Sequence, residues 1–396
     1  MKNNIPAIRF PEFTLGWKST TLNKVTNIIG GGTPDTKEPT YWDGEIDWYS
    51  PSEIGKKIYA DGSVRKITQL GLEKSSAKIL PANKTILFTS RAGIGDTAIL
   101  KKDGATNQGF QSLVVHDNCD VYFLYSMNNK IKSYALKNAS GSTFLEISGK
   151  NLGVMPMLIP SPEEQTKIGT FFKSLDDTIS LHQQELEALK QTKQGFLQKM
   201  FPKNEDAVPE IRLKGFTDEW TLCELKNVAT FINGRAYKQN ELLDSGKYKV
   251  LRVGNFYTNT SWYYSDLELG EKYYANFGDL LYTWSASFGP HIWKGDKVIY
   301  HYHIWRVDLK DGFDKHFIVQ LFEYDKAKIM SDKNGSTMVH ITKKGMEEKI
   351  VRIPSYDEQI KIGEFFKQLD EVIELKEKEL EALKETKKGF LQKMFV

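Results

Sequence analysis

The chain has 396 residues, a formal net charge of +3, an apolar fraction of 40% and a charged fraction of 27%. These values are typical of a soluble globular protein, and the length exceeds what one ordinary core needs, so two domains are expected. A transmembrane helix is not predicted, because the sequence has no run of about 18 apolar residues. Only two cysteines are present, Cys119 and Cys223, which argues against a disulfide framework and predicts a cytoplasmic location.

The two halves of the chain begin alike. Arg9 and Trp17 match Arg212 and Trp220 at a constant offset (212 − 9 = 203; 220 − 17 = 203). From Lys84 onward the offset is 194, so the first copy carries nine additional residues between these points (203 − 194 = 9). We place this additional length in the turn-rich stretch 30–48, as a loop insertion.

Short elements are predicted at equivalent places in both copies. Two equivalent strands, each followed by a glycine turn, are predicted within 84–95 and 278–289. A second equivalent pair of strands is predicted within 106–115 and 300–307. Helices are predicted at 121–138 and 315–332, followed by Gly-Ser-Thr turns at 141–143 and 335–337. The backbone pattern repeats while the polar and aromatic side chains differ, so we expect two mixed α+β domains.

Each half ends in a long helix that is nearly the same in both copies. Residues 160–201 and 354–395 align at the offset of 194, and roughly seven in ten positions are identical, as expected for an internal duplication. A serine suits the N-cap of each helix, and the glutamate three positions later (Glu164 or Glu358) predicts a capping box. Apolar residues then recur with a period of about 3.5, which predicts a coiled-coil seam. We expect the helices to pair with each other rather than only to cover their own domains.

The seam has the same composition in both copies. Its apolar positions are Ile168, Phe172, Leu175, Ile179, Leu186, Leu189, Ile362, Phe366, Leu369, Ile373, Leu380 and Leu383. Polar residues interrupt it at equal depths, His182 and Lys376 first, then Lys193 and Lys387. Such residues weaken a coiled coil but fix its register and partner.

The expected architecture follows from this duplication. The predicted parts are a first domain (1–159), a central spacer helix (160–203), a second domain (204–353) and a distal spacer helix (354–396). The fold class is α+β, with two globular domains separated by two long helices that form an antiparallel coiled coil with pseudo-two-fold symmetry. Two diverged domains on such a spacer suit a ligand with two separated sites, and duplex DNA is the expected one.

Several motifs occur in a characteristic order. They are Gly31-Gly32-Thr33-Pro34, Tyr41-Trp42-Asp43-Gly44, Asp47-Trp48, the run from Leu87 to Arg91, Ile94-Gly95-Asp96, the run from Asn107 to Phe110, both Gly-Ser-Thr turns and both Ile-Pro-Ser-x-x-Glu-Gln helix starts. Each motif is weak alone, but together and duplicated they are specific. Over essentially the whole chain, the sequence resembles the specificity (S) subunits of type I restriction–modification systems.

The resemblance implies two target-recognition domains that each bind one half of a bipartite, asymmetric DNA sequence, with the coiled coil setting the spacing. It implies a non-catalytic subunit on which two modification subunits dock to methylate adenine N6 with S-adenosylmethionine, while ATP-dependent restriction subunits join to cleave DNA. No cofactor is expected on this chain itself. The sequence agrees, because it has no Asn/Asp-Pro-Pro-Tyr/Phe run and no phosphate-binding Gly-x-x-x-x-Gly-Lys-Ser/Thr loop.

Candidate DNA contacts are polar, basic or aromatic residues in loops that differ between copies. In the first domain we expect base contacts from Arg91, Gln108 and Gln111, and phosphate contacts from Lys56, Lys57, Arg65 and Lys66. In the second domain the candidates are Arg235, Tyr237, Lys238, Arg252, Asn255, Trp284, Ser285, His301 and His303. The two histidines could instead form a metal pair, but no third ligand is evident, and no metal or catalytic residue is predicted. Any of these lysines could equally be an ordinary solvated charge, and many of the rings could be packing residues.

Three other interpretations stay open at this point. The chain could be a standalone enzyme with its own methyltransferase or nuclease, although the motifs for these are absent. It could be a scaffold held by its coiled coil without binding DNA, which fits duplicated but diverged loops poorly. It could also be a silent copy that donates recognition domains by recombination, because such a copy would have the same sequence features.

Overall fold

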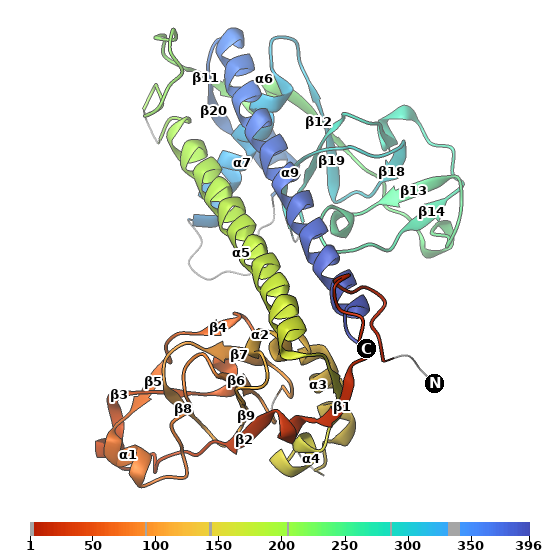
Figure 1. Cartoon of the computed structure of the whole chain (residues 1–396). Coiled ribbons are helices and arrows are strands. Elements are labelled where there is room, and N and C mark those ends of the chain that lie inside the picture. Colours follow the sequence, from red (N-terminus) through yellow and green to blue (C-terminus); the bar gives the residue numbers. More distant parts are fainter. Residues whose placement is uncertain (1–3, 92, 142–144, 204–205, 286, 332–340) are drawn as a thin grey trace. The chain divides into compact units, whose positions relative to one another are not determined.

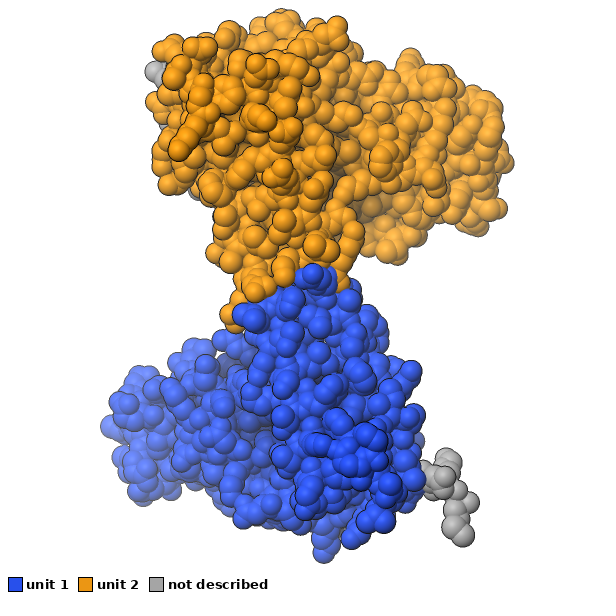
Figure 2. All heavy atoms as spheres, turned by 45° about the horizontal axis from the view of Figure 1, so that its top comes forward, with its two compact units in different colours: residues 1–183, 379–396 blue, residues 184–378 orange. Residues whose placement is uncertain are grey.

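The computed structural model describes residues 4–91, 93–141, 145–203, 206–285, 287–331 and 341–396, and Figure 1 shows its elements in chain order. The chain divides into two compact units (Figure 2). The first unit contains residues 1–183 and 379–396, and the second contains residues 184–378. Each unit therefore combines one globular domain with part of both long helices.

The first unit contains two sheets and a separate strand pair. The larger sheet has the order β2 (Thr26–Gly30), β9 (Gln111–Val115), β6 (Thr85–Phe88), β7 (Thr97–Leu100) and β4 (Tyr59–Ala60). The smaller sheet has the order β5 (Arg65–Ile67), β3 (Trp42–Tyr49) and β8 (Gly104–Thr106), and β1 (Lys18–Thr21) pairs with β10 (Pro156–Ile159). Every residue of β6 and β7 is buried, which explains their continuous apolar and β-branched sequences.

Among the described residues of the first domain, the α-helices are α1 (Gln69–Glu73), α2 (Val121–Ser126), α3 (Asn128–Asn138) and α4 (Gly149–Gly153). The prediction of one continuous helix at 121–138 is therefore wrong. Two helices, α2 and α3, are separated at Met127, whose ψ of 2° departs from helical geometry. The Met127 side chain is buried in the main core cluster, so packing fixes the break. Ser142 and Thr143 of the first predicted Gly-Ser-Thr turn, and all of the second turn, lie outside the described residues.

The second unit repeats this plan. One sheet has the order β12 (Ala229–Asn233), β19 (Ile304–Leu309), β16 (Leu280–Thr283) and β17 (Gly289–Ile292). The other has the order β14 (Tyr263–Ser265), β13 (Tyr248–Leu251), β18 (Val298–Tyr300) and β15 (Tyr274–Ala275), and β11 (Thr221–Glu224) pairs with β20 (Ile350–Ile353). The helices are α6 (Leu225–Val228), α7 (Lys315–Ser331) and α8 (Lys343–Glu347). The segments predicted as strands near 106–115 and 300–307 each contain a break between two strands.

Strand register corrects the predicted position of the loop insertion. In the first unit Trp48 pairs with Ala105, and in the second Val250 pairs with Ile299. Ala105 and Ile299 are equivalent at the offset of 194, so Trp48 is equivalent to Val250, at an offset of 202 (250 − 48 = 202). Only one of the nine additional residues therefore lies before this point (203 − 202 = 1), and the insertion predicted in 30–48 is wrong.

The remaining length lies after β3. Arg65 pairs with Trp48, and Tyr263 pairs with Val250, which gives an offset of 198 (263 − 65 = 198). Four additional residues therefore lie between β3 and β5, in the segment that contains β4, and four more lie between β5 and β6. The predicted position was wrong because it was based on turn residues alone. Loops that have the same length in both copies can also be rich in glycine and proline.

The long helices α5 (Pro162–Lys199) and α9 (Tyr356–Lys393) are 38 residues each. In the first unit Phe171 contacts Phe390 with ring centroids 5.0 Å apart, and His182 faces Glu379 at 3.7 Å, so rising residue numbers on α5 meet falling numbers on α9. The pairing is antiparallel. The leading seam residues of α5, Ile168 and Phe172, also join the core of the first domain, so this part of the helix covers its own domain as well.

The second unit shows the same antiparallel pairing. Phe196 contacts Phe365 at 5.1 Å, and Lys376 lies 3.5 Å from Glu185. Among the predicted seam residues Leu186, Ile373 and Leu380 are buried, Ile362 and Phe366 join the core of the second domain, and Leu175, Ile179, Leu189, Leu369 and Leu383 are half-buried. The predicted α+β class, with two repeated domains and an antiparallel helix pair, is confirmed.

The end of each helix belongs to the core of the opposite domain. Phe201, just after α5, stacks on Phe317 at 5.6 Å within the second unit. Phe395, just after α9, stacks on Phe172 at 5.7 Å within the first unit. Each domain therefore holds the start of one long helix and the end of the other.

Only one of the two hydrogen bonds of the predicted capping box forms at the start of each long helix. The amide of Glu164 donates to Ser161 Oγ at 3.4 Å, but the Glu164 carboxylate instead accepts two hydrogen bonds from Arg9, both at 2.7 Å. Arg212 binds Glu358 in the same way at 2.8 and 2.7 Å. The arginine and glutamate repeats are thus partners, because a forked guanidinium satisfies a buried carboxylate better than one backbone amide.

The glutamine after each glutamate fastens the domain to the helix. Gln165 accepts from the amide of Asp120 at 3.1 Å and donates to the carbonyl of Pro160 at 3.0 Å. Gln359 makes the same two contacts with Asp314 and Pro354, both at 3.1 Å. The repeated Glu-Gln pair therefore has a structural role.

Candidate nucleic-acid interface

Four segments of the first domain lie close together: residues 31–34, 50–54, 90–91 and 107–110. Backbone hydrogen bonds join them, from Gly32 to Thr106 (2.8 Å), from Ser90 to Gly109 (2.8 Å) and from Asn107 to Tyr49 (3.0 Å). Gly31 is required here, because a Cβ at this position would lie 1.9 Å from the carbonyl oxygen of Asn107. The glycine-rich motif thus serves close backbone packing.

The second domain has the same frame of backbone hydrogen bonds. They run from Arg235 to Tyr300 (3.1 Å), from Trp284 to His303 (3.2 Å) and from His301 to Leu251 (2.9 Å). Gly234 repeats the close approach, since its Cβ would lie 2.4 Å from the carbonyl oxygen of His301. Each bond joins the same positions as in the first domain, at offsets of 203, 202 or 194.

The side chains on this shared frame differ. The exchanged pairs are Gly32/Arg235, Ser50/Arg252, Ser90/Trp284, Arg91/Ser285, Asn107/His301, Gln108/Tyr302 and Gly109/His303. A conserved backbone with exchanged loop side chains is the arrangement expected of two surfaces that bind different sequences with the same architecture.

Two of the predicted base contacts come together in the first domain. Arg91 is half-buried, and its Nε lies 3.6 Å from where a Cβ of Gly109 would stand, next to Gln108. Gln108 is exposed and its side chain is hydrogen-bonded to the hydroxyl of Thr33. Gln111 lies further along β9, opposite Gly30, so it is separate from this pair.

The predicted phosphate contacts of the first domain fall into two places. Lys56 and Lys57 are exposed in the segment after the 3-10 turn Pro51–Glu53. Arg65 lies on β5 with its guanidinium 3.6 Å from the ring centre of Trp42, and neighbouring Lys66 lies 3.9 Å from Asp47. The stacking holds Arg65 in a defined direction while leaving its nitrogens available for phosphate oxygens.

Several candidates of the second domain are occupied by contacts within the protein. Glu241 binds Arg235 through two hydrogen bonds of 3.0 and 2.7 Å, which raise the pKa of Arg235. Tyr237 packs in an apolar cluster with Val250, and burial raises its pKa. Lys238, in contrast, is exposed.

Arg252 and Asn255 build a turn. Asn255 accepts from the amide of Arg252 at 3.0 Å and donates to the carbonyl of Ser261 at 2.9 Å. The guanidinium of Arg252 lies 4.3 Å from the ring centre of Tyr263. Asn255 therefore shapes the loop, whereas Arg252 adds a positive charge beside it.

The remaining candidates of the second domain surround one loop tip. Trp284 donates from its indole nitrogen to the carbonyl of Tyr302 at 3.0 Å, and Ser285 follows it, half-buried. The rings of His301 and His303 have centroids 4.9 Å apart. Burial, with smaller contributions from His303 and Arg252, lowers the pKa of His301 to about 4, so its imidazole is neutral near pH 7.

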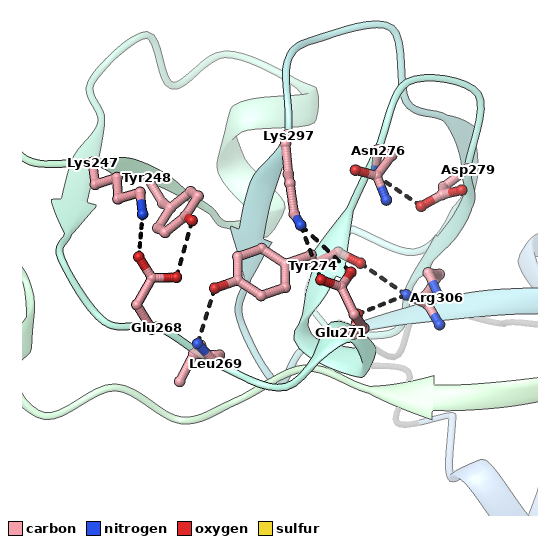
Figure 3. Close-up of polar contacts among 10 residues, drawn as sticks. All are labelled: Lys247, Tyr248, Glu268, Leu269, Glu271, Tyr274, Asn276, Asp279, Lys297 and Arg306. Carbon is pink, nitrogen blue, oxygen red and sulfur yellow. Dashed lines mark hydrogen bonds and ion pairs between the residues drawn. The ribbon is translucent and has the colours of Figure 1, made fainter.

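Other cations of the second domain contact carboxylates and carbonyls of the same domain (Figure 3). Arg306 donates to the carbonyl of Tyr274 at 2.9 Å, and Lys297 contacts Glu271 at 3.2 Å. Lys247 is paired with Glu268. These charges are engaged in contacts within the protein, whereas Arg252 acts electrostatically on His301 and Lys238 is exposed.

Asn107 and Tyr302 were not among the sequence-based candidates, but they occupy the same loops as the chosen residues. The sequence alone could have identified Tyr302, because it stands at the position equivalent to the candidate Gln108. Ser50 and Thr33 were missed for a different reason: only the folded loops bring them next to residues 107–109.

Within the described residues, no group of three or more His, Cys, Asp and Glu side chains is placed to hold a metal ion. Likewise, none of the helices in this part of the chain is long and apolar enough to cross a membrane.

Comparison with known proteins places this arrangement in context. Residues 14–191 and 217–385 match the profile of the type I restriction modification DNA specificity domain, once in each half. The chain is 29% identical over 400 residues to the MjaIX type I restriction enzyme specificity subunit of Methanocaldococcus jannaschii, covering 96% of this chain and 92% of that protein. It is 30% identical over 176 residues to the EcoR124I/EcoR124II specificity subunit of Escherichia coli, covering 43% of each. Its fold is similar to the crystal structure of a type I restriction–modification S subunit from M. genitalium, with a TM-score of 0.62, 16% identity and 99% of both chains covered.

Proposed function

Because the chain belongs to the family of type I restriction–modification DNA specificity subunits, whose role is DNA recognition rather than catalysis, we propose that it binds a bipartite, asymmetric DNA target. The first domain binds one half-site through the loops that carry Arg91 and Gln108, and the second binds the other through the equivalent loops. The observation that carries this proposal is the shared backbone frame with exchanged side chains.

The helix pair supports the bipartite form of the target. A helix of 38 residues is about 57 Å long. Two half-sites one turn of B-DNA apart are separated by about 34 Å, so a spacer of this length suits half-sites separated by unread base pairs. Antiparallel pairing gives each domain an equivalent attachment to the spacer, as a two-part target requires.

We further propose that two modification subunits dock on equivalent surfaces of the helices and that restriction subunits join the complex. Exposed helix residues that are identical in both copies support this, such as Glu187/Glu381 and Gln198/Gln392. Packing does not explain identity at exposed positions, whereas two copies of one partner would. The modification subunits would use S-adenosylmethionine, the chain itself binding no cofactor, and the complex would act in the cytoplasm.

A methylome comparison of the host with and without this gene tests the proposal. One two-part adenine-methylation motif should disappear on deletion and return on complementation. An unchanged methylome, or loss of an undivided motif, would contradict it. Incubation of the purified chain alone with DNA and labelled S-adenosylmethionine should give no methyl transfer, and transfer by the chain alone would favour a standalone enzyme.

A further inference from the structure

A column of aromatic rings runs from the core of the second domain to its loop edge. The buried rings of Tyr282 and Trp305 stack with centroids 5.9 Å apart and planes at 18°. Trp284 also stacks on Trp305, at 5.8 Å and 21°. The edge of this column is therefore supported by a packed core rather than by a mobile loop.

The column ends in a group that we name the aromatic tip: Trp284, His301, Tyr302 and His303. The Tyr302 ring lies 4.3 Å from His301 and 3.9 Å from His303, yet Tyr302 stays 39% exposed. Its backbone is fixed at both polar groups, because its amide donates to Arg235 at 3.1 Å and its carbonyl accepts from Trp284 at 3.0 Å. An exposed ring is thus presented in a fixed position.

The equivalent positions of the first domain carry Ser90, Asn107, Gln108 and Gly109. The backbone frame is the same in both domains, so folding requirements do not explain why one has rings and the other has hydroxyl and amide groups. The exchange changes the kind of contact that each loop edge can make. Amide groups match base edges through hydrogen bonds, whereas rings contact base faces or separate neighbouring bases.

The charges around the tip fit contact with bases. The imidazole of His301 is neutral near pH 7, because burial lowers its pKa to about 4, so it does not pair with phosphate as a cation. Arg252 lies nearby and supplies a positive charge beside the tip, and Lys238 is exposed on the adjoining loop. Rings flanked by basic groups are common where a protein deforms the duplex while holding its backbone.

We propose that Tyr302 inserts as a wedge against a base step of the second half-site, so that the second domain recognises a deformable step while the first domain recognises base edges. The inference rests on the proposed function, because it requires that the second domain binds DNA. Flexible pyrimidine–purine steps are the expected contact, since they unstack most easily.

Fluorescence of 2-aminopurine tests the wedge, because this base brightens when it is unstacked. The full-length chain is first used to select its target from random duplexes, and 2-aminopurine is then placed at each position of both half-sites. Binding should raise the fluorescence at one step of the second half-site and at none of the first. Tyr302→Ala should remove this rise and weaken binding roughly tenfold, as expected for loss of one stacking contact.

Two variants keep the test decisive. Tyr302→Phe retains the ring and should behave as the wild type, whereas Gln108→Ala, at the matched position, should weaken binding and leave the fluorescence rise unchanged. The wedge is overturned if the wild type selects a target but no probe brightens, or if Tyr302→Phe loses as much as Tyr302→Ala, which would identify a hydroxyl contact. If the wild type selects no sequence at all, the proposed function itself fails.

Discussion

Lys387 of α9 donates to Oδ1 of Asp176 on α5 at 2.5 Å, and the hydroxyl of Tyr122 on α2 donates to the other oxygen of the same carboxylate at 2.9 Å. One carboxylate therefore joins the two long helices and the first domain. The equivalent pair in the second unit is Lys193 and Asp370, also at 2.5 Å. The three lysines that interrupt the predicted seam, Lys193, Lys376 and Lys387, thus form ion pairs with the opposite helix.

The two pairs differ in burial, which predicts unequal effects of mutation. The Asp176 side chain is 5% exposed, whereas that of Asp370 is 43% exposed. Lys387→Met leaves a buried carboxylate without its cation and should cost about 3 kcal/mol of unfolding free energy. Lys193→Met, the matched control, should cost less than about 1 kcal/mol. Urea denaturation of both variants measures the difference, and equal losses would contradict the assignment.

Arg91→Ala should weaken binding to the first half-site selectively. Loss of one base contact costs about 1–3 kcal/mol, or roughly 10- to 100-fold in affinity for the correct sequence. Ser285→Ala at the equivalent position of the second domain is the control. Competition binding with duplexes altered in one half-site at a time gives the answer, and unchanged discrimination at the first half-site in Arg91→Ala would refute the role.

Gly31→Ala should disturb the loops of the first domain, because the added methyl would meet the carbonyl of Asn107 at 1.9 Å. We expect the first half-site to be bound about tenfold more weakly, as for loss of one base contact. Gly62→Ala is the control, because no atom lies within 4 Å of its added methyl. Amide exchange of residues 107–110 should be faster in Gly31→Ala alone, and equal exchange in both variants would count against the close approach.

Lengthening the helix pair should lengthen the unread DNA between half-sites. Seven residues inserted after Leu189 in α5, together with seven after Ile373 in α9, preserve the seam and add about 10 Å, or about three base pairs. Methylome sequencing then measures the new spacer. An insertion in α5 alone is the control, since it would misalign Lys193 and Asp370 and destabilise the pair. An unchanged DNA spacer after the double insertion would show that the helix pair does not set the distance between half-sites.

Acid should destabilise the second domain through its histidines. Burial lowers the pKa of His291 and of His301 from 6.5 to about 4, and the charge of Lys326 adds to the effect at His291. The unfolded chain therefore binds more protons between these values, so stability falls as the pH falls from about 6.5 toward 4. Amide exchange of β16 and β17 followed over this range should show the loss, and His291→Gln should reduce its pH dependence. An identical profile in His291→Gln would rule out this histidine as the cause.

The candidate site was only partly predictable. Arg91 and Gln108 were chosen as candidates because they stand beside glycine turns and change between copies, which are local features of the sequence. Arg235 looked similar, but the folded loop brings Glu241 to it, and the carboxylate holds its guanidinium. Whether a basic side chain is available depends on neighbours that loop folding selects, and composition does not encode them.

The sequence by itself determined the duplication, the long helices and the seam, because identity at a constant offset and a 3.5-residue period are properties of the chain read in order. Only the tertiary structure decided which partners those elements take. It paired Arg9 with Glu164 and placed most of the additional length after β3. It also placed Phe201, which follows the first domain in the chain, in the core of the second domain, and Phe395, which follows the second domain, in the core of the first. The physical reason is that these contacts join residues far apart in the chain, where packing and burial of charge, rather than local pattern, select the partner.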